Sequence, residues 1–229
     1  MVQFNFEDLG KVDYRECWDL QEEILEKTVQ DRIQKGVPSG KNSFLLVEHP
    51  HVYTLGKSGN PGNILIPDEF LKKIGATFYR INRGGDITYH GPGQIVGYPV
   101  FDLEVLKVGL REYISRLEEA IILTLKEYGL AGSRFSGGTG VWLDPDVKGR
   151  ARKICAIGVK ASRFVTMHGF AFNVNTDLTY FDNINPCGFT DKGVTSLSKE
   201  LCEIQDINLV KRLVKKNLTQ VFDLEWINQ

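Results

Sequence analysis

Apolar residues recur at helical spacing in three segments of the chain. They fall on one side of a helix over residues 13–36, 110–128 and 206–222. Asp13 stands where the first helix would begin and can cap it, and Gly36 can end it in a left-handed conformation. The pattern therefore predicts three amphipathic helices, near the start, the middle and the end of the chain.

Shorter segments are continuously apolar or alternate between apolar and polar residues, which is typical of strands. The strands predicted in this way cover residues 43–48, 52–55, 76–81, 95–103, 141–143, 153–159 and 165–173, the last two as a neighbouring pair. A short helix is predicted over residues 68–74, and turns or loops over residues 59–67, 144–150 and 185–188. Because helices and strands interleave irregularly, the sequence predicts a single mixed α+β domain over residues 1–229, not a regular βαβ winding.

The composition is typical of a globular protein, with 42% hydrophobic and 25% charged residues among 229. A chain of this length can bury a large core without disulfides or metals. The net charge of −1 argues against a nucleic-acid partner, and no apolar run approaches membrane-spanning length. The first thirteen residues hold three acids and one lysine, unlike a signal or transit peptide. We therefore expect a cytoplasmic monomer that binds neither nucleic acid nor membranes.

One part of the sequence is strongly basic. Between Lys148 and Arg163 there is no acid, and the basic residues are Lys148, Arg150, Arg152, Lys153, Lys160 and Arg163. Such a run is typical either of a solvated face or of a docking patch for an acidic partner, and the sequence favours neither.

The cysteines and histidines do not form a recognisable metal motif. Cys17, Cys155, Cys187 and Cys202 include no CxxC pair, so we expect reduced thiols and no zinc site of the usual spacing. Cys17 and Cys202 are expected in the core. His49 and His51 flank Pro50, which favours a structural turn. A metal protein using His49, His51, His90 and His168 remains an alternative that metal analysis would decide.

Residues 83–94 hold four glycines and a proline around Tyr89 and His90. Glycine permits the backbone to approach a ligand closely. An isolated segment of this composition is also typical of a hairpin or a bulge, so other residues must decide between these interpretations.

Two reactive side chains stand in unusual surroundings. Cys187 lies between Pro186 and Gly188, a corner that can expose a thiol beside a free backbone N–H, as an activated nucleophile requires. The alternative is a small apolar residue at a turn. Lys153 interrupts an apolar strand, and a lysine ammonium lowers the pKa of a neighbouring thiol. Strand alternation places Cys155 on the same side as Lys153, which makes it the second candidate nucleophile, although a buried structural thiol is favoured there.

Several spaced motifs resemble the lipoyl(octanoyl) transferases of lipoate biosynthesis over residues 10–220. The motifs are Arg83-Gly84-Gly85, Thr88-Tyr89-His90-Gly91-Pro92-Gly93-Gln94, Arg152-Lys153-Ile154, Ala156-Ile157-Gly158, His168-Gly169-Phe170-Ala171 and Asn185-Pro186-Cys187-Gly188. The resemblance implies an α+β domain similar to the catalytic core of biotin and lipoate ligases.

The resemblance also implies an activity: transfer of octanoyl from octanoyl-acyl carrier protein to a lysine of lipoyl domains, without a cofactor, through a thioester on cysteine. The acceptors implied are the E2 subunits of 2-oxoacid dehydrogenases and the glycine cleavage H protein. Cys187 and Lys153 match the catalytic pair. The acyl-binding residues implied are Arg83, Gly84, Gly85, Asp86, Ile87, Thr88, Tyr89, His90, Ala156, Ile157, Gly158, Gly169, Phe170 and Ala171. Asp86 stands where glutamine is more usual, and the loop over residues 143–149 is longer than expected.

Two further interpretations differ in chemistry. An ATP-dependent lipoate–protein ligase would be expected to carry a Ser-Gly-Gly-Gly loop and Tyr-His-Asp in place of Tyr89-His90-Gly91, and ATP dependence would identify it. A catalytically silent acyl-binding protein would have little need of both Lys153 and Cys187, and an assay of octanoyl transfer would identify it.

Overall fold

A large, mostly antiparallel sheet forms the centre of the computed structural model, which describes residues 3–36, 41–185 and 192–227. Its strands run in the order β1 (Gln3–Lys11), β2 (Lys41–Glu48), β6 (Gln94–Val100), β10 (Val165–Asn173), β9 (Arg152–Ser162), β8 (Gly138–Leu143) and β7 (Ser133–Phe135). The short β11 (Gly193–Val194) pairs in parallel with the start of β9. Cys187 and the rest of the predicted loop after Asn185 lie outside the described residues.

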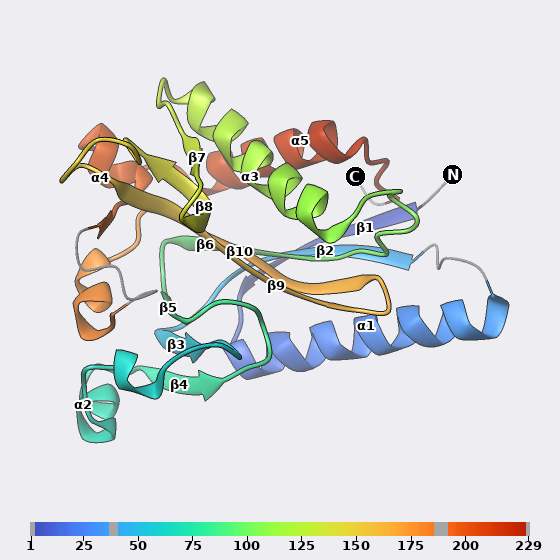
Figure 1. Cartoon of the computed structure of the whole chain (residues 1–229), viewed down its shortest axis with the longest axis horizontal. Helices are drawn as coiled ribbons and strands as arrows, with labels where there is room; N and C mark the ends of the chain where they lie inside the picture. Colours follow the sequence, from blue (N-terminus) through green and yellow to red (C-terminus); the bar gives the residue numbers. More distant parts are fainter. Residues whose placement is uncertain (1–2, 37–40, 186–191, 228–229) are drawn as a thin grey trace.

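Helices cover both faces of this sheet (Figure 1). α3 (Leu110–Glu127) and α5 (Ile207–Phe222) lie on one face, and α1 (Tyr14–Lys35) lies on the other. The main hydrophobic core fills the space between the sheet and the helices α3 and α5, with Leu117, Ile121 and Val214 fully buried. Apolar side chains of α1 pack on the opposite face against β2, β6 and β10.

A second, smaller sheet stands beside one end of the first (Figure 1). It has the order β4 (Thr77–Arg80), β3 (Val52–Leu55) and β5 (Ile87–His90). α2 (Asp68–Lys73), the 3₁₀ turn η1 (Pro61–Asn63) and the 3₁₀ turn η2 (Leu178–Asn183) flank it. Its own core includes Tyr53, Tyr89 and Phe181. The strand β5 is part of the predicted glycine-rich segment, and residues 91–93 connect it directly to the central strand β6 of the large sheet.

The predicted helix ends are confirmed where a cap is encoded locally. The Asp13 carboxylate accepts a hydrogen bond from the backbone N–H of Arg15, and Gly36 ends α1 with φ 64°. Asp206 caps α5 in the same way through Asn208 and Leu209. The predicted strand pair over residues 153–159 and 165–173 is also confirmed, as the antiparallel pair β9 and β10.

Four features of the local structure were predicted incompletely or wrongly. No strand was predicted at residues 3–11, where β1 pairs in parallel with β2. The strand predicted over residues 95–103 ends at Val100, although Asp102 beyond it still forms an isolated antiparallel bridge with Val165 of β10. Four residues of the glycine-rich segment form β5. α4 (Leu197–Leu201) was also not predicted.

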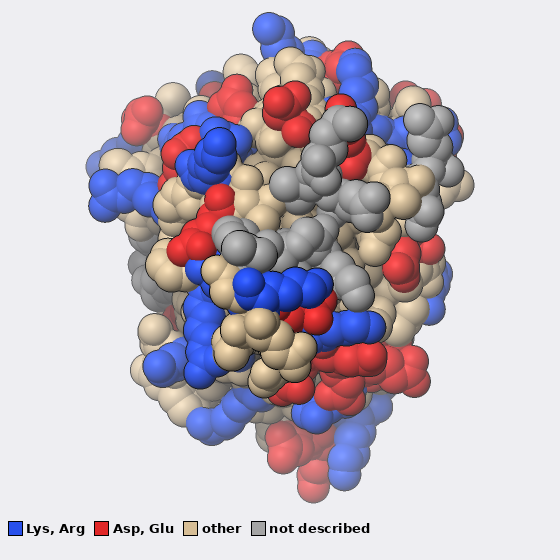
Figure 2. Space-filling view, turned by 90° about the vertical axis from the view of Figure 1, so that its right-hand side faces the viewer, with Lys and Arg blue, Asp and Glu red and all other residues tan. Residues whose placement is uncertain are grey.

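Charged side chains of both signs are interspersed on the face shown in Figure 2. This distribution agrees with a net charge of −1. Among the described residues, no helix is long and apolar enough to span a membrane.

Candidate active site

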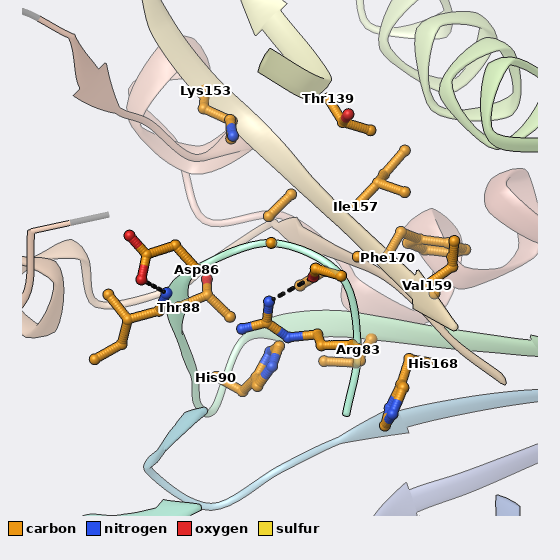
Figure 3. A pocket seen from close by; sticks show the side chains of 18 of the residues that line it. Arg83, Asp86, Thr88, His90, Thr139, Lys153, Ile157, Val159, His168 and Phe170 are labelled. Atoms are coloured by element: carbon orange, nitrogen blue, oxygen red, sulfur yellow. Dashed lines mark hydrogen bonds between the residues drawn. The ribbon is translucent and has the colours of Figure 1, made fainter. Parts of the chain in front are cut away.

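The glycine-rich segment and the central sheet enclose a cavity of about 420 Å³ (Figure 3). Thirteen of the fourteen predicted acyl-binding residues line it, together with Lys153 from β9. These thirteen are Arg83, Gly84, Gly85, Asp86, Ile87, Thr88, His90, Ala156, Ile157, Gly158, Gly169, Phe170 and Ala171. The fold thus brings three separated segments of the sequence to one place, although their role in binding an acyl group stays a prediction.

The segment around Arg83 covers the cavity and forms its roof, and both main-chain and side-chain hydrogen bonds hold it in place. The backbone N–H of Gly84 donates to the carbonyl oxygen of Val159 at 3.0 Å, on the side of β9 that faces the segment. The buried Arg83 guanidinium donates to the Thr54 carbonyl at 2.8 Å and to the Thr54 Oγ1 at 3.0 Å. A Cβ on Gly56 would stand 2.3 Å from the Gly85 carbonyl oxygen, so this approach requires glycine. The roof is therefore fastened to both sheets.

Asp86 fastens the same segment at its other end. Its carboxylate accepts hydrogen bonds from the backbone N–H of Ile87 at 2.8 Å and of Asn60 at 3.2 Å, and from the Asn63 side-chain amide. Asp86, which stands where the resembled family more usually has glutamine, is thus hydrogen-bonded to Asn63 of the η1 turn.

The floor of the cavity is made of very small residues in two cross-strand pairs. Ala156 of β9 faces Ala171 of β10, and Gly158 faces Gly169. Paired residues on antiparallel strands project on the same face of a sheet, so these four positions leave a shallow trough there. A trough without large side chains is suited to a flexible alkyl chain, while Ile157 and Phe170 between these pairs pack against the main core.

We expect Gly158→Ala to raise the apparent KM for an octanoyl donor by about 10- to 100-fold, since small displacements of positioning groups can cost that much. The new Cβ would stand 2.9 Å from the Gly84 carbonyl oxygen and 3.1 Å from the Arg83 Cδ, so the roof must move. Steady-state kinetics with octanoyl-acyl carrier protein measure the effect. Gly109→Ala is the matched control, because its Cβ would meet nothing within 4 Å. Equal KM values for the two variants would contradict the assignment of the trough.

Lys153 is fixed on both sides by neighbouring strands. It pairs with Trp142 of β8 and with Val194 of β11, and its carbonyl accepts the backbone N–H of Thr195 at 2.9 Å. Its ammonium lies over the indole ring of Trp142, 4.6 Å from the ring centroid. A cation–π contact of this kind holds a flexible lysine in one direction. Figure 3 shows Lys153 and Thr139 at one end of the cavity.

Cys155 is separated from Lys153 by a bulge. The register between β8 and β9 shifts at this point, so that Ile154 and Cys155 are both fully buried in the main core. Strict alternation therefore fails, and Cys155 does not line the cavity, whereas Lys153 does. Burial raises the pKa of the Cys155 thiol far above its ordinary value, which disfavours a thiolate there.

The other two described cysteines differ from one another. Cys17 is buried, as expected, and burial raises the pKa of its thiol to about 12. The expectation that Cys202 is buried was wrong, because this residue is exposed at the end of α4 in a left-handed conformation with φ 55°.

Arg152 anchors the strand that carries Lys153. Its guanidinium makes two 2.6 Å hydrogen bonds to the Glu200 carboxylate and one of 2.7 Å to Asp144. Glu200 also accepts a hydrogen bond from the Thr195 hydroxyl at 2.6 Å, next to the Lys153 carbonyl. The Arg152 hydrogen bond is the largest influence that lowers the pKa of Glu200. Arg152 thus has a structural role within the basic run of the sequence.

His90 forms part of the cavity wall, whereas Tyr89 lies outside the cavity lining. Tyr89 is the predicted acyl-binding residue that does not line the cavity. Its ring stacks on Tyr180, and its hydroxyl lies 2.7 Å from the His51 Nδ1. His90 lines the cavity, with its Nδ1 2.9 Å from the Gln94 side-chain oxygen. Burial lowers the pKa of His90 to about 3, so its imidazole is neutral at neutral pH.

A chain of buried amides links His90 to the Lys153 backbone. The Gln94 Nε2 donates to the Asn173 Oδ1 at 2.8 Å, and the Asn173 Nδ2 donates to the Thr195 carbonyl at 3.0 Å. Thr195 in turn contacts Lys153. Sequence analysis did not single out Asn173 or Thr195 as separate site residues, because their link to Lys153 depends on contacts between residues far apart in the sequence.

The rings of His49 and His90 lie near one another, with centroids 6.1 Å apart. Within residues 3–36, 41–185 and 192–227, no three His, Cys, Asp or Glu side chains are arranged to hold a metal ion. His49 is engaged through Nδ1 with the Val12 carbonyl and through Nε2 with the Tyr98 hydroxyl, each at 2.8 Å.

Solved structures show where this fold occurs. A bipartite lipoate protein ligase from Thermoplasma acidophilum superposes with a TM-score of 0.67 at 13% identity, over 100% of this chain and 87% of that one. Biotin protein ligase from Aquifex aeolicus, in complex with biotin and ATP, gives 0.54 at 15% identity, over 96% and 70%. Identities this low show the fold alone. The superpositions confirm the prediction of a mixed domain like the catalytic cores of biotin and lipoate ligases.

Sequence similarity is much closer to one group of enzymes. Residues 13–219 match the family model of the lipoyl protein ligase A/B catalytic domain. The octanoyltransferase of Parabacteroides distasonis is 55% identical over 97% of this chain and 100% of its own length. That of Flavobacterium psychrophilum is also 55% identical, over 95% of each chain. The chain therefore belongs to the lipoyl protein ligase A/B family and, within it, to the octanoyltransferases.

Proposed function

We propose that this chain transfers an octanoyl group in two steps, through a thioester on Cys187 and with Lys153 as the group that exchanges protons. The chain is an octanoyltransferase of lipoate biosynthesis, with acyl carrier protein as donor and lipoyl domains as acceptors. The observation that carries the proposal is the place of Lys153 at one end of a cavity whose floor is cleared of large side chains.

In the first step the Cys187 thiolate attacks the carbonyl carbon of the donor thioester. A carbon–sulfur bond to Cys187 forms, the bond to the carrier breaks, and the carrier thiolate takes a proton from the Lys153 ammonium, which leaves Lys153 neutral. A nearby ammonium favours a thiolate, and the fixed Lys153 would supply that charge. Exchange of one thioester for another is close to balanced in free energy.

In the second step the acceptor lysine amine attacks the thioester on Cys187. An amide bond forms, the bond to the Cys187 sulfur breaks, and the amine gives up a proton that neutral Lys153 can take. An amide lies downhill from a thioester, so this route needs no ATP. The backbone N–H groups near Gly85, Gly158 and Gly188 are candidates to bind the oxyanion.

Intact mass spectrometry tests the proposal directly. The protein mixed with octanoyl-acyl carrier protein and no ATP should gain the mass of one octanoyl group, and a lipoyl domain added afterwards should remove it. Transfer that required ATP would instead identify a lipoate–protein ligase, and a protein that formed no adduct would contradict the covalent route.

The finer details of partners are part of the same proposal. We propose E2 subunits of 2-oxoacid dehydrogenases and the glycine cleavage H protein as acceptors, and one monomeric catalytic domain over residues 1–229 as the acting unit, located in the cytoplasm. Transfer assays with each purified acceptor and light scattering of the free enzyme check the first two statements.

We expect acyl carrier protein, an acidic partner, to dock on the basic run between Lys148 and Arg163. The fold offsets part of this charge, since Asp144 contacts both Arg150 and Arg152. Reversing Lys148 and Arg150 to glutamate should raise the apparent KM for the carrier-bound donor and flatten its salt dependence, because exposed rim charges act on association. Reversal of Lys72 and Lys73 in α2 is the control. An unchanged KM at low salt would show that acyl carrier protein does not dock on this basic run.

A further inference from the structure

The η1 turn holds the chain that leads to Cys187. The backbone N–H of Asn185 donates to the Asn63 carbonyl at 2.8 Å, and the backbone N–H of Leu65 donates to the Asn183 carbonyl at 2.9 Å. The residues between these two hydrogen bonds form an antiparallel bridge. Cys187 follows Asn185 by two residues, and two residues of chain span at most roughly 7 Å. The place of Asn185 therefore restricts where the proposed nucleophile can stand.

Asn63 is also bound to the roof of the acyl cavity. Its side-chain amide donates a hydrogen bond to the carboxylate of Asp86, which lines the cavity (Figure 3). The same carboxylate accepts the backbone N–H groups of Ile87 and Asn60, so Asp86 is fixed from three directions. Asn63 thus makes one hydrogen bond toward the roof, through its side chain, and one toward Asn185, through its carbonyl.

The chemistry of this contact suits an aspartate at position 86. A carboxylate offers two oxygens that only accept hydrogen bonds, and three donors converge on Asp86. A glutamine, which the resembled family more usually has there, offers a single acceptor oxygen on a longer side chain. A hydrogen bond to an ionised acceptor is also about twice as strong as one between neutral groups. Asp86 is therefore well matched to hold the Asn63 amide in one position.

We propose that Asp86 and Asn63 are positioning residues for acyl transfer, whose hydrogen bond couples the roof of the acyl cavity to Asn185 and thereby aligns Cys187 with the acyl group that the cavity holds. This inference rests on the proposed function and deepens it. Neither side chain acts on the thioester itself, because both act through the backbone at Asn185. A misplacement of about 1 Å at a reacting centre can cost roughly 100-fold in rate, so a contact at this distance from the chemistry can govern it.

The test exchanges the two side chains. Asn63→Asp sets two carboxylates against one another, and the single-turnover rate of acylation at saturating octanoyl-acyl carrier protein should fall about 10- to 100-fold. Asp86→Asn alone should change the rate little, because the Asn63 amide can turn its oxygen toward the new amide. Combined with Asn63→Asp it restores a donor and an acceptor, so most of the rate should return. Asp68→Asn, which removes an exposed carboxylate from α2, is the matched control.

A second measurement reads the position of the thiol without an acyl donor. Iodoacetamide is applied in a Cys202→Ala background, where the other two described cysteines are buried. If Cys187 stands beside the Lys153 ammonium, its alkylation reports a lowered thiol pKa. Asn63→Asp should move this pH profile up toward the ordinary value of about 8.5, and adding Asp86→Asn should return it. Asn63→Ala removes the donor without adding a charge and should shift the profile in the same direction.

Three results would overturn the coupling alone. The first is a normal acylation rate in Asn63→Asp, and the second is a loss that Asp86→Asn does not recover. The third is a loss confined to the KM for the donor, with the saturated rate and the pH profile unchanged, because the pair would then serve only the roof. If Asn63→Asp does not fold, Asn63→Ala takes its place in both measurements. An unaltered enzyme that formed no octanoyl adduct would instead overturn the proposed function, and the coupling with it.

Discussion

Replacement of Cys187 by alanine should abolish both the octanoyl adduct and transfer to a lipoyl domain, with a loss of roughly 10⁴-fold or more. Without the thiol no covalent intermediate can form, and the acceptor amine would have to attack the carrier thioester directly. Mass spectrometry of the intact variant and a single-turnover assay measure the two losses. The melting temperature should change little, because the substitution removes one sulfur atom and keeps the flanking Pro186 and Gly188.

The other cysteines supply the controls for this experiment. Cys202→Ala removes the exposed thiol at the end of α4 and should keep full activity. Cys155→Ala changes a residue that is buried in the main core, so it should lower stability and leave the adduct in place. Peptide mapping that put the octanoyl group on Cys155 would overturn the assignment of Cys187.

Local signals in the sequence predicted most of the helices and the central strands. Asp13, Gly36 and Asp206 act within their own turn of the chain, so the caps they form can be read without knowing the fold. β1 gave no such signal, because its place is decided by a parallel partner, β2, and by a contact between Phe4 and Trp226 near the far end of the chain.

The candidate site shows the same division between local and distant causes. Its glycines and small residues stand in short motifs, and the family resemblance of these motifs implied a shared role for three segments that the fold brings to one cavity. Trp142 and Glu200 escaped prediction because they act on Lys153 and Arg152 only after β8 and α4 have packed beside β9. The bulge that separates Cys155 from Lys153 was equally invisible, since it depends on the register with β8.

Lys153→Arg should slow amide formation by about 10² to 10⁴-fold, the usual cost of losing a general base. If Lys153 acted only through its positive charge, arginine would serve nearly as well over the Trp142 ring, because it also makes cation–π contacts. A guanidinium stays protonated in proteins, however, and cannot accept the proton of the incoming amine. The variant should therefore still form some octanoyl-enzyme and then deacylate slowly. Lys160→Arg, on the same strand, is the matched control and should retain both half-reactions.

His90 is the alternative base, and its surroundings argue against that role. Burial lowers its pKa to about 3, so the ring is neutral and a weak base at neutral pH, and its Nδ1 is already engaged with Gln94. His90→Ala should consequently reduce amide formation less than Lys153→Arg does. Single-turnover measurement of acylation and of deacylation in both variants separates the two residues. Near-normal deacylation by Lys153→Arg together with an inactive His90→Ala would transfer the base role to His90, and would leave Lys153 with the charge that favours the Cys187 thiolate.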